Sequence, residues 1–162
     1  MPPSESASRI EIRWATIDEA ASIAAVLHEA FVEFEALYTP AAFAATTLTP
    51  ELIAKRWGEG PVWVALRAGE VVGTVAAVDR GETLYIRSMG VLPSARGQAV
   101  GTRLLEHVEA FARTRRSRRM VLSTTPFLLR AIQRYERHGF VRTREGPAEL
   151  LGTPLFTMEK AL

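Results

Sequence analysis

Residues 85–111, YIRSMGVLPSARGQAVGTRLLEHVEAF, decide the fold of this chain. They begin as an extended apolar segment and turn at Pro93. After the turn, apolar residues recur at helical spacing from Leu104 to Phe111. The sequence therefore predicts a strand that leads through a glycine-bearing loop into a helix.

The loop between this strand and this helix is suited to binding an anion. The first turn of a helix carries unpaired N–H groups and the positive end of the helix dipole. Gly97 and Gly101 let the backbone approach a phosphate closely, and Arg96 can add positive charge. Two glycines also suit an ordinary turn, so the loop alone leaves both interpretations open.

The segment from Val91 to Gly101 resembles the acyl-CoA pyrophosphate loop of the GNAT superfamily of N-acyltransferases. Ala99 stands where the first glycine of that pattern is expected. The resemblance implies acetyl-CoA as cosubstrate, with backbone groups of the strand pairing with its pantetheine arm and polarising the thioester. The residues that it assigns to acetyl-CoA binding are Met89, Gly90, Val91, Arg96, Gly97, Gln98, Ala99, Val100, Gly101 and Thr102.

A second segment, AIQRYERHGF at residues 131–140, resembles the other signature of that family. The resemblance implies that Tyr135 is the general acid that protonates the leaving thiolate, which suits a hydroxyl that stays protonated at neutral pH. The alternative is a core tyrosine packed against Leu128 and Ile132. Leu128 replaces an asparagine that often contacts the pantetheine arm, and Thr124 and Thr125 are candidates to compensate.

The general base and the acceptor site are less clearly marked. The aligned base position is Tyr85, with Glu82 just outside the strand, and both are candidates. Three residues of the first helix could also serve, or could simply face solvent: His28, Glu33 and Glu35. Some family members need no base if the amine arrives neutral. The resemblance places the unidentified amine acceptor against Phe31, Phe34, Tyr38 and Tyr85.

Composition fits one globular domain at residues 9–162 after a disordered tail at residues 1–8. The net charge is +2, but 18 of the 20 basic residues are arginine, which suits phosphate-bearing partners. The absence of cysteine excludes a cysteine acyl-enzyme. The sequence lacks a signal peptide pattern and an apolar stretch of membrane-span length, so we expect a cytoplasmic protein without membrane contact.

The remaining periodicity predicts a mixed α+β chain. Thr16 and Glu19 form a capping box for a first helix that runs to Phe34. The element order matches the fold that the resemblance implies: a mostly antiparallel seven-stranded sheet with helices on both faces, whose fourth and fifth strands splay apart. Strands are expected at 10–14, 62–66, 71–78, 83–92, 120–124, 140–144 and 155–160, and further helices at 50–58, 100–112 and 126–138, with a partly helical loop at 35–49.

Two other classes of function remain open. A non-catalytic acyl-CoA sensor would explain Ala99, Leu128 and the missing strand glutamate. The arginine cluster at residues 113–119 suggests nucleic-acid binding, but no aromatic residue interleaves with it for base stacking. The three histidines share no metal-ligand spacing, so no metal is expected. Dimers are common among proteins with this resemblance, so a homodimer is one expected state.

Overall fold

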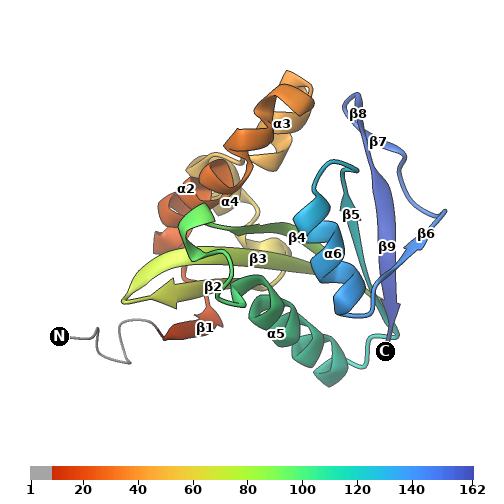
Figure 1. Ribbon diagram of the computed structural model, residues 1–162. Coiled ribbons are helices and arrows are strands. Elements are labelled where there is room, and N and C mark those ends of the chain that lie inside the picture. The colour runs from red at the N-terminus through yellow and green to blue at the C-terminus, as the bar shows by residue number, and fades with distance from the viewer. Residues whose placement is uncertain (1–8) are drawn as a thin grey trace.

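The computed structural model describes residues 9–162, and its seven-stranded sheet confirms the predicted α+β fold (Figure 1). The strand order is β1-β2-β3-β4-β5-β9-β6; β4 and β5 run parallel, and the other neighbours are antiparallel. The strands of this sheet are β1 (Ile10–Trp14), β2 (Val62–Arg67), β3 (Glu70–Arg80), β4 (Thr83–Val91), β5 (Arg119–Thr124), β6 (Val141–Thr143) and β9 (Phe156–Ala161).

The described residues also form five α-helices and a small hairpin. The helices are α2 (Ala20–Phe31), α3 (Pro40–Thr46), α4 (Pro50–Lys55), α5 (Val100–Thr114) and α6 (Leu129–Arg137). Short 3-10 segments are η1 (Ile17–Glu19), η2 (Val32–Leu37), η3 (Trp57–Glu59) and η4 (Pro93–Ala95), and the hairpin pairs β7 (Glu149–Leu150) with β8 (Thr153–Pro154).

Alternation along the strands gives the sheet two buried faces. In β2, Trp63 and Ala65 face the core under α5, whereas Val64 and Leu66 face α2 and α4. The α5 face is held by Leu104, Leu105 and Val108, all fully buried. Figure 1 shows α2 to α4 gathered on one side of the central strands, with α5 on the other.

The parallel pair in the centre of the sheet separates soon after it begins. The strands β4 and β5 pair only at Thr83, Leu84 and Tyr85, although β4 continues to Val91. Figure 1 shows the two strands diverging from a shared end. The edge of β4 that faces β5 is therefore unpaired beyond Tyr85, which confirms the predicted splay of the fourth and fifth strands.

Several predicted boundaries are wrong. The first helix ends at Phe31 and continues as the 3-10 segment η2. The partly helical loop predicted at 35–49 is confirmed, with α3 as its helical part. The last helix begins at Leu129, because residues 126–127 form a turn after β5. The loop expected between the last two strands contains β7 and β8. The predicted tail at residues 1–8 lies outside the described residues, and the single-domain boundary at residue 9 stays a prediction.

Candidate functional site

The loop before α5 combines left-handed residues with an uncapped helix start. Gly97 has φ of 81° and Ala99 has φ of 59°, so alanine adopts the left-handed conformation at the position where glycine is expected. This costs about 1–2 kcal/mol for a residue with a Cβ. No side chain caps α5, and its first turn holds no acidic residue. The first N–H groups therefore remain available to an anion.

Side chains on both sides hold this loop in place. The Arg67 guanidinium donates to the carbonyl oxygen of Ser94 (3.2 Å) and to Oε1 of Gln98 (3.3 Å). Arg96 forms an ion pair with Glu33 in η2. The charge that the sequence assigns to Arg96 is thus engaged by a carboxylate in the free protein, although both side chains are partly exposed and such a pair is weak.

Arg134 is the residue at this loop that sequence reasoning missed. A Cβ built on Gly101 would lie 2.5 Å from both Nε and Cζ of Arg134, so the guanidinium lies against the first turn of α5. Arg134 forms no salt bridge or side-chain hydrogen bond with any described residue, and burial lowers the pKa of its guanidinium. An unpaired cation at the positive end of a helix is unfavourable unless an anion binds beside it.

The strand β4 carries a bulge at the start of the splay. Its pairing with β3 shifts between Thr74 and Ala76, and Ser88 adopts φ of 51°. Beyond the bulge, a Cβ on Gly90 would lie 3.2 Å from Ala30 of α2, so glycine permits this helix to pack closely on the strand. The backbone of Met89, Gly90 and Val91 is therefore held rigidly beside the unpaired edge of β4.

Tyr135 projects from α6 toward the same part of β4. Its hydroxyl donates to Sδ of Met89 at 3.8 Å, and its ring packs edge-on against Phe140 with centroids 5.9 Å apart. Burial raises the pKa of Tyr135 above its usual value, so the hydroxyl stays protonated at neutral pH. The structure thus brings the predicted acid to the strand segment predicted to bind the thioester.

The structure does not bring the candidate bases close to Met89 and the predicted thioester position. Glu82 precedes β4 at its far end, seven residues before Met89 and roughly 20 Å along an extended chain, where it pairs with Arg118 at 3.3 Å. Tyr85 lies at the last paired position of β4, and the Arg80 guanidinium stacks 4.2 Å from its ring centroid. Among the first-helix alternatives, Glu33 is engaged by Arg96.

Two of the four predicted acceptor residues, Phe34 and Tyr38, form an aromatic cluster with Phe127, whereas Tyr85, at the last position of β4 that pairs with β5, is not part of it. Phe34 and Tyr38 pack on Phe127, with centroids 6.2 Å and 4.9 Å away, whereas Phe31 packs against Gly90. Phe127 follows β5, and nothing in the sequence signals its place here. Tyr38 is only 7% exposed, and burial raises its pKa. Its ring therefore packs within the cluster and leaves little surface for an acceptor to contact.

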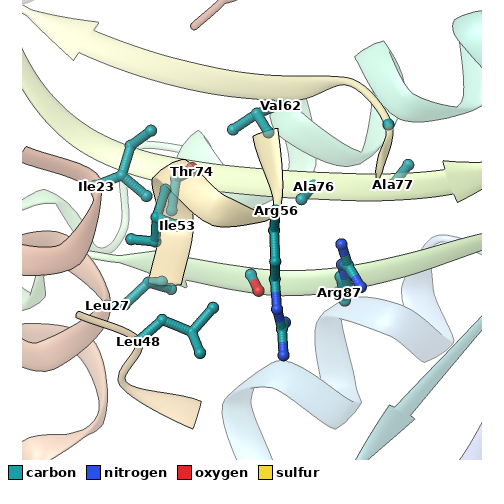
Figure 2. A pocket seen from close by; sticks show the side chains of 12 residues that line it. Ile23, Leu27, Leu48, Ile53, Arg56, Val62, Thr74, Ala76, Ala77 and Arg87 are labelled. Carbon is teal, nitrogen blue, oxygen red and sulfur yellow. The ribbon is translucent and has the colours of Figure 1, made fainter. Parts of the chain in front are cut away.

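A pocket opens on the α2 side of the same stretch of β4. Its walls are largely apolar, and two arginines line one end of it, Arg56 from the end of α4 and Arg87 from β4 (Figure 2). The cavity volume is about 30 Å³, which leaves room for at least one water molecule. Arg87 also hydrogen-bonds Glu59, and this bond lowers the pKa of the Glu59 carboxyl.

Most of the arginine cluster after α5 is neutralised by carboxylates. Arg115 pairs with Asp79, Arg118 with Glu82, and Arg119 with both Glu145 and Glu159. Arg113 pairs with Glu109 within α5. Paired guanidinium groups offer less charge to a phosphate backbone, so the cluster gives little support to nucleic-acid binding.

No group of His, Cys, Asp or Glu among residues 9–162 could hold a metal ion. The helices in the same range include none that is long and apolar enough to cross a membrane.

Comparison with known proteins identifies the family of this chain. Residues 23–140 match the model of the acetyltransferase (GNAT) family. This chain belongs to the GNAT family. The match confirms the resemblance found in the loop before α5 and in the segment around Tyr135.

Relatives and solved structures agree with the GNAT assignment. The chain is 38% identical over 85 residues to N-acetylaspartate synthetase of Danio rerio, covering 51% of this chain and 30% of that protein. It is 38% identical over 79 residues to IAA acetyltransferase of Azospirillum brasilense, covering 48% of this chain and 52% of that one. The chain thus spans about half or less of the length of these relatives.

Among solved GNAT structures, the PaiA N-acetyltransferase of Thermoplasma acidophilum in complex with coenzyme A superposes with a TM-score of 0.78 at 15% identity. The alignment covers 95% of this chain and 99% of that chain. At this identity the likeness shows the fold alone.

At the position where the GNAT pattern expects an asparagine, this chain has Leu128, and a buried threonine hydroxyl lies nearby. Leu128 directly precedes α6. Nearby, the Thr125 hydroxyl is buried without a hydrogen bond of normal geometry, although the Tyr38 hydroxyl approaches it. A buried hydroxyl without a partner is costly. Of the two threonines proposed to compensate for Leu128, Thr125 is the one whose hydroxyl is fully buried without a well-formed hydrogen bond.

Proposed function

We propose that this chain is an acetyl-CoA-dependent N-acetyltransferase that transfers the acetyl group to a primary amine by direct attack. One observation carries the proposal: the unpaired edge of β4 lies between an uncapped helix start at Val100 and the Tyr135 hydroxyl. In the proposal, the unpaired edge of β4 binds the pantetheine arm, the helix start at Val100 binds the diphosphate, and the Tyr135 hydroxyl protonates the sulfur. The coenzyme A present in the structurally similar PaiA protein supports the choice of cosubstrate.

In this proposal, the backbone from Arg96 to Thr102 binds the diphosphate together with Arg134. The backbone of Met89 to Val91 pairs with the pantetheine arm, and Thr125 donates a hydrogen bond to it. A main-chain N–H of β4 polarises the thioester carbonyl, because a donor fixed at a forming oxyanion lowers the barrier strongly.

The chemistry needs two proton movements besides the transfer itself. The amine nitrogen bonds to the carbonyl carbon, the carbon–sulfur bond breaks, and Tyr135 donates its proton to the departing thiolate. The attacking nitrogen loses one proton to water or to a base. Glu82 is distant and the aligned base position holds Tyr85 in place of a carboxylate, so we propose that the amine is deprotonated before it attacks.

A non-catalytic acyl-CoA sensor is the second candidate. The lack of a carboxylate at position 85, beside the splay, favours it. A sensor would bind acetyl-CoA with the same loop and strand but would release no thiol with any amine. For the enzyme, we also propose a cytoplasmic location and a homodimer. Gel filtration with light scattering tests whether the protein is a dimer.

Calorimetric titration with acetyl-CoA and with CoA tests the cosubstrate. A thiol-release screen over amines, amino acids, aminoglycosides and peptides then distinguishes enzyme from sensor. Micromolar binding with turnover supports the enzyme, and binding without turnover supports the sensor. The absence of binding to either nucleotide at millimolar concentration would overturn both.

A further inference from the structure

We propose that the amine acceptor carries a carboxylate, as an α-amino acid does, and that Arg56 and Arg87 bind this carboxylate. The inference rests on the proposed acetyltransferase function, because it assigns the substrate class of the same site.

The pocket beside β4 has excess positive charge. Its lining includes two arginines and no carboxylate, and its other walls are mainly the side chains of Ile23, Leu27, Leu48, Ile53 and Val62. Figure 2 shows Arg56 and Arg87 on the side of the pocket that lies away from Ile23, Leu27 and Leu48. Burying one sign of charge against apolar walls is favourable only when an opposite charge joins it.

Carboxylates near the pocket do not balance these arginines. Glu59 is hydrogen-bonded to Arg87, and the nearby charge of Arg56 also helps to lower the pKa of this carboxyl, although Arg56 forms no salt bridge with any described residue. The next acidic residues along β3 and its turn, Asp79 and Glu82, are paired with Arg115 and Arg118. At least one guanidinium therefore remains for an incoming anion.

Glu59 also shows which anion suits Arg87. The guanidinium of Arg87 already holds a carboxylate, whose side chain is half exposed on the short segment η3. A planar guanidinium matches a planar carboxylate in a two-point contact. The cavity volume of about 30 Å³ leaves room for a small polar group such as a carboxylate.

The pocket lies next to the proposed thioester position. Arg87 and Ser88 line it, and Met89 follows directly on the same strand. These residues come just after Tyr85, where β4 leaves β5. An acceptor whose carboxylate lies on the two arginines would hold an amine a few bonds away against the unpaired edge of β4. Polyamines, which carry only positive charge, would be repelled.

Thiol release with matched acceptors tests this substrate class. Each amino acid is compared with the amine that lacks its carboxylate: phenylalanine with 2-phenylethylamine, leucine with 3-methylbutylamine, and lysine with cadaverine. A charge-assisted contact is worth about 1.5–3 kcal/mol, which corresponds to about a 10- to 100-fold preference in kcat/KM for the best amino acid over its partner.

The variants Arg56→Gln and Arg87→Gln should raise KM for that amino acid about tenfold or more and leave KM for acetyl-CoA unchanged. Arg137→Gln, at an exposed position of α6, is the matched control and should behave as wild type. A second measurement is independent of turnover: with saturating CoA, N-acetylphenylalanine should bind more tightly than N-acetyl-2-phenylethylamine, and Arg87→Gln should remove the difference.

The inference is wrong if the amines without a carboxylate, or spermidine, match or exceed the amino acids in turnover and their acetylated forms bind equally well. That result would leave the proposed acetyltransferase function intact. Failure of acetyl-CoA to bind would instead refute the function, and the same comparison of acetylated ligands, made without CoA, would still report on the arginine pocket.

Discussion

Arg134 provides the sharpest test of how this protein binds its cosubstrate. Its guanidinium is half-buried against Gly101, at the uncapped start of α5, and burial lowers its pKa. In the free protein this charge has no carboxylate partner among the described residues. Replacing Arg134 with glutamine should therefore leave the stability of the free protein unchanged or slightly increased, because it removes an uncompensated cation from the positive end of a helix.

Binding should change in the opposite direction. If Arg134 binds the diphosphate, its loss removes one charge-assisted contact worth about 1.5–3 kcal/mol. That corresponds to about a 10- to 100-fold rise in Kd for CoA. The loss should be equal for dephospho-CoA, which keeps the diphosphate, and absent for pantetheine, which lacks it.

Calorimetry with these three ligands, alongside a thermal melt of the free protein, measures both effects. Arg137→Gln serves as the control, since Arg137 lies on the same helix but is exposed. Wild-type affinity of Arg134→Gln for CoA would refute the assignment. So would a loss that is as large for pantetheine as for CoA, because it would indicate a disturbed α6 and not a lost phosphate contact.

Three further substitutions test the other parts of the site. Gly101→Trp should abolish CoA binding and keep the fold by circular dichroism, because even a Cβ there meets the movable end of Arg134; unchanged affinity would refute the loop assignment. Tyr135→Phe should lower kcat with little change in CoA affinity. Because burial raises the pKa of Tyr135, the wild-type kcat should not fall with rising pH until above the usual pKa of a tyrosine; full activity of Tyr135→Phe would exclude this acid. Thr125→Val removes a buried unpaired hydroxyl, so it should raise the melting temperature by about 2–4 °C and weaken acetyl-CoA binding; unweakened binding would exclude the contact to the arm.

The parts of the fold that depend on local signals were predictable. The capping box is present, with the Thr16 N–H donating to Glu19 at 2.9 Å, and Gly139 adopts the left-handed conformation that ends the last helix. The valine-rich hairpin of β2 and β3 follows from period-two alternation. Each of these features is determined by residues close together in the sequence.

The errors arise where distant contacts override local preference. Pro126 is a good first residue of a helix, but the turn after β5 places Phe127 in the aromatic cluster with Phe34 and Tyr38, and the helix starts three residues later. The β7–β8 hairpin is fixed from outside as well, because the Thr39 hydroxyl donates to the carbonyl oxygen of Leu151 at 2.8 Å.

The same limit explains which site residues the sequence missed. Arg134 and Arg56 look like solvated helix residues in the sequence, whereas Thr125 is marked there only as one of two candidates to compensate for Leu128. Their significance comes from their contacts: Arg134 and Arg56 form no salt bridge with any described residue, and the Thr125 hydroxyl has no hydrogen bond of normal geometry. No spacing rule can predict a missing partner, since it depends on every chain segment that folds nearby.

These unsatisfied groups lie around the splayed strand β4, at the positions where the diphosphate, the pantetheine arm and the acceptor would bind. Each one costs stability in the free protein, and each cost is relieved by a ligand group of complementary chemistry. Filling the same positions with partners from the chain itself would give a more stable protein whose site was already occupied. The distribution of unpaired groups, more than any single motif, is therefore what supports the proposed binding of an anionic cosubstrate and the proposed carboxylate-bearing acceptor.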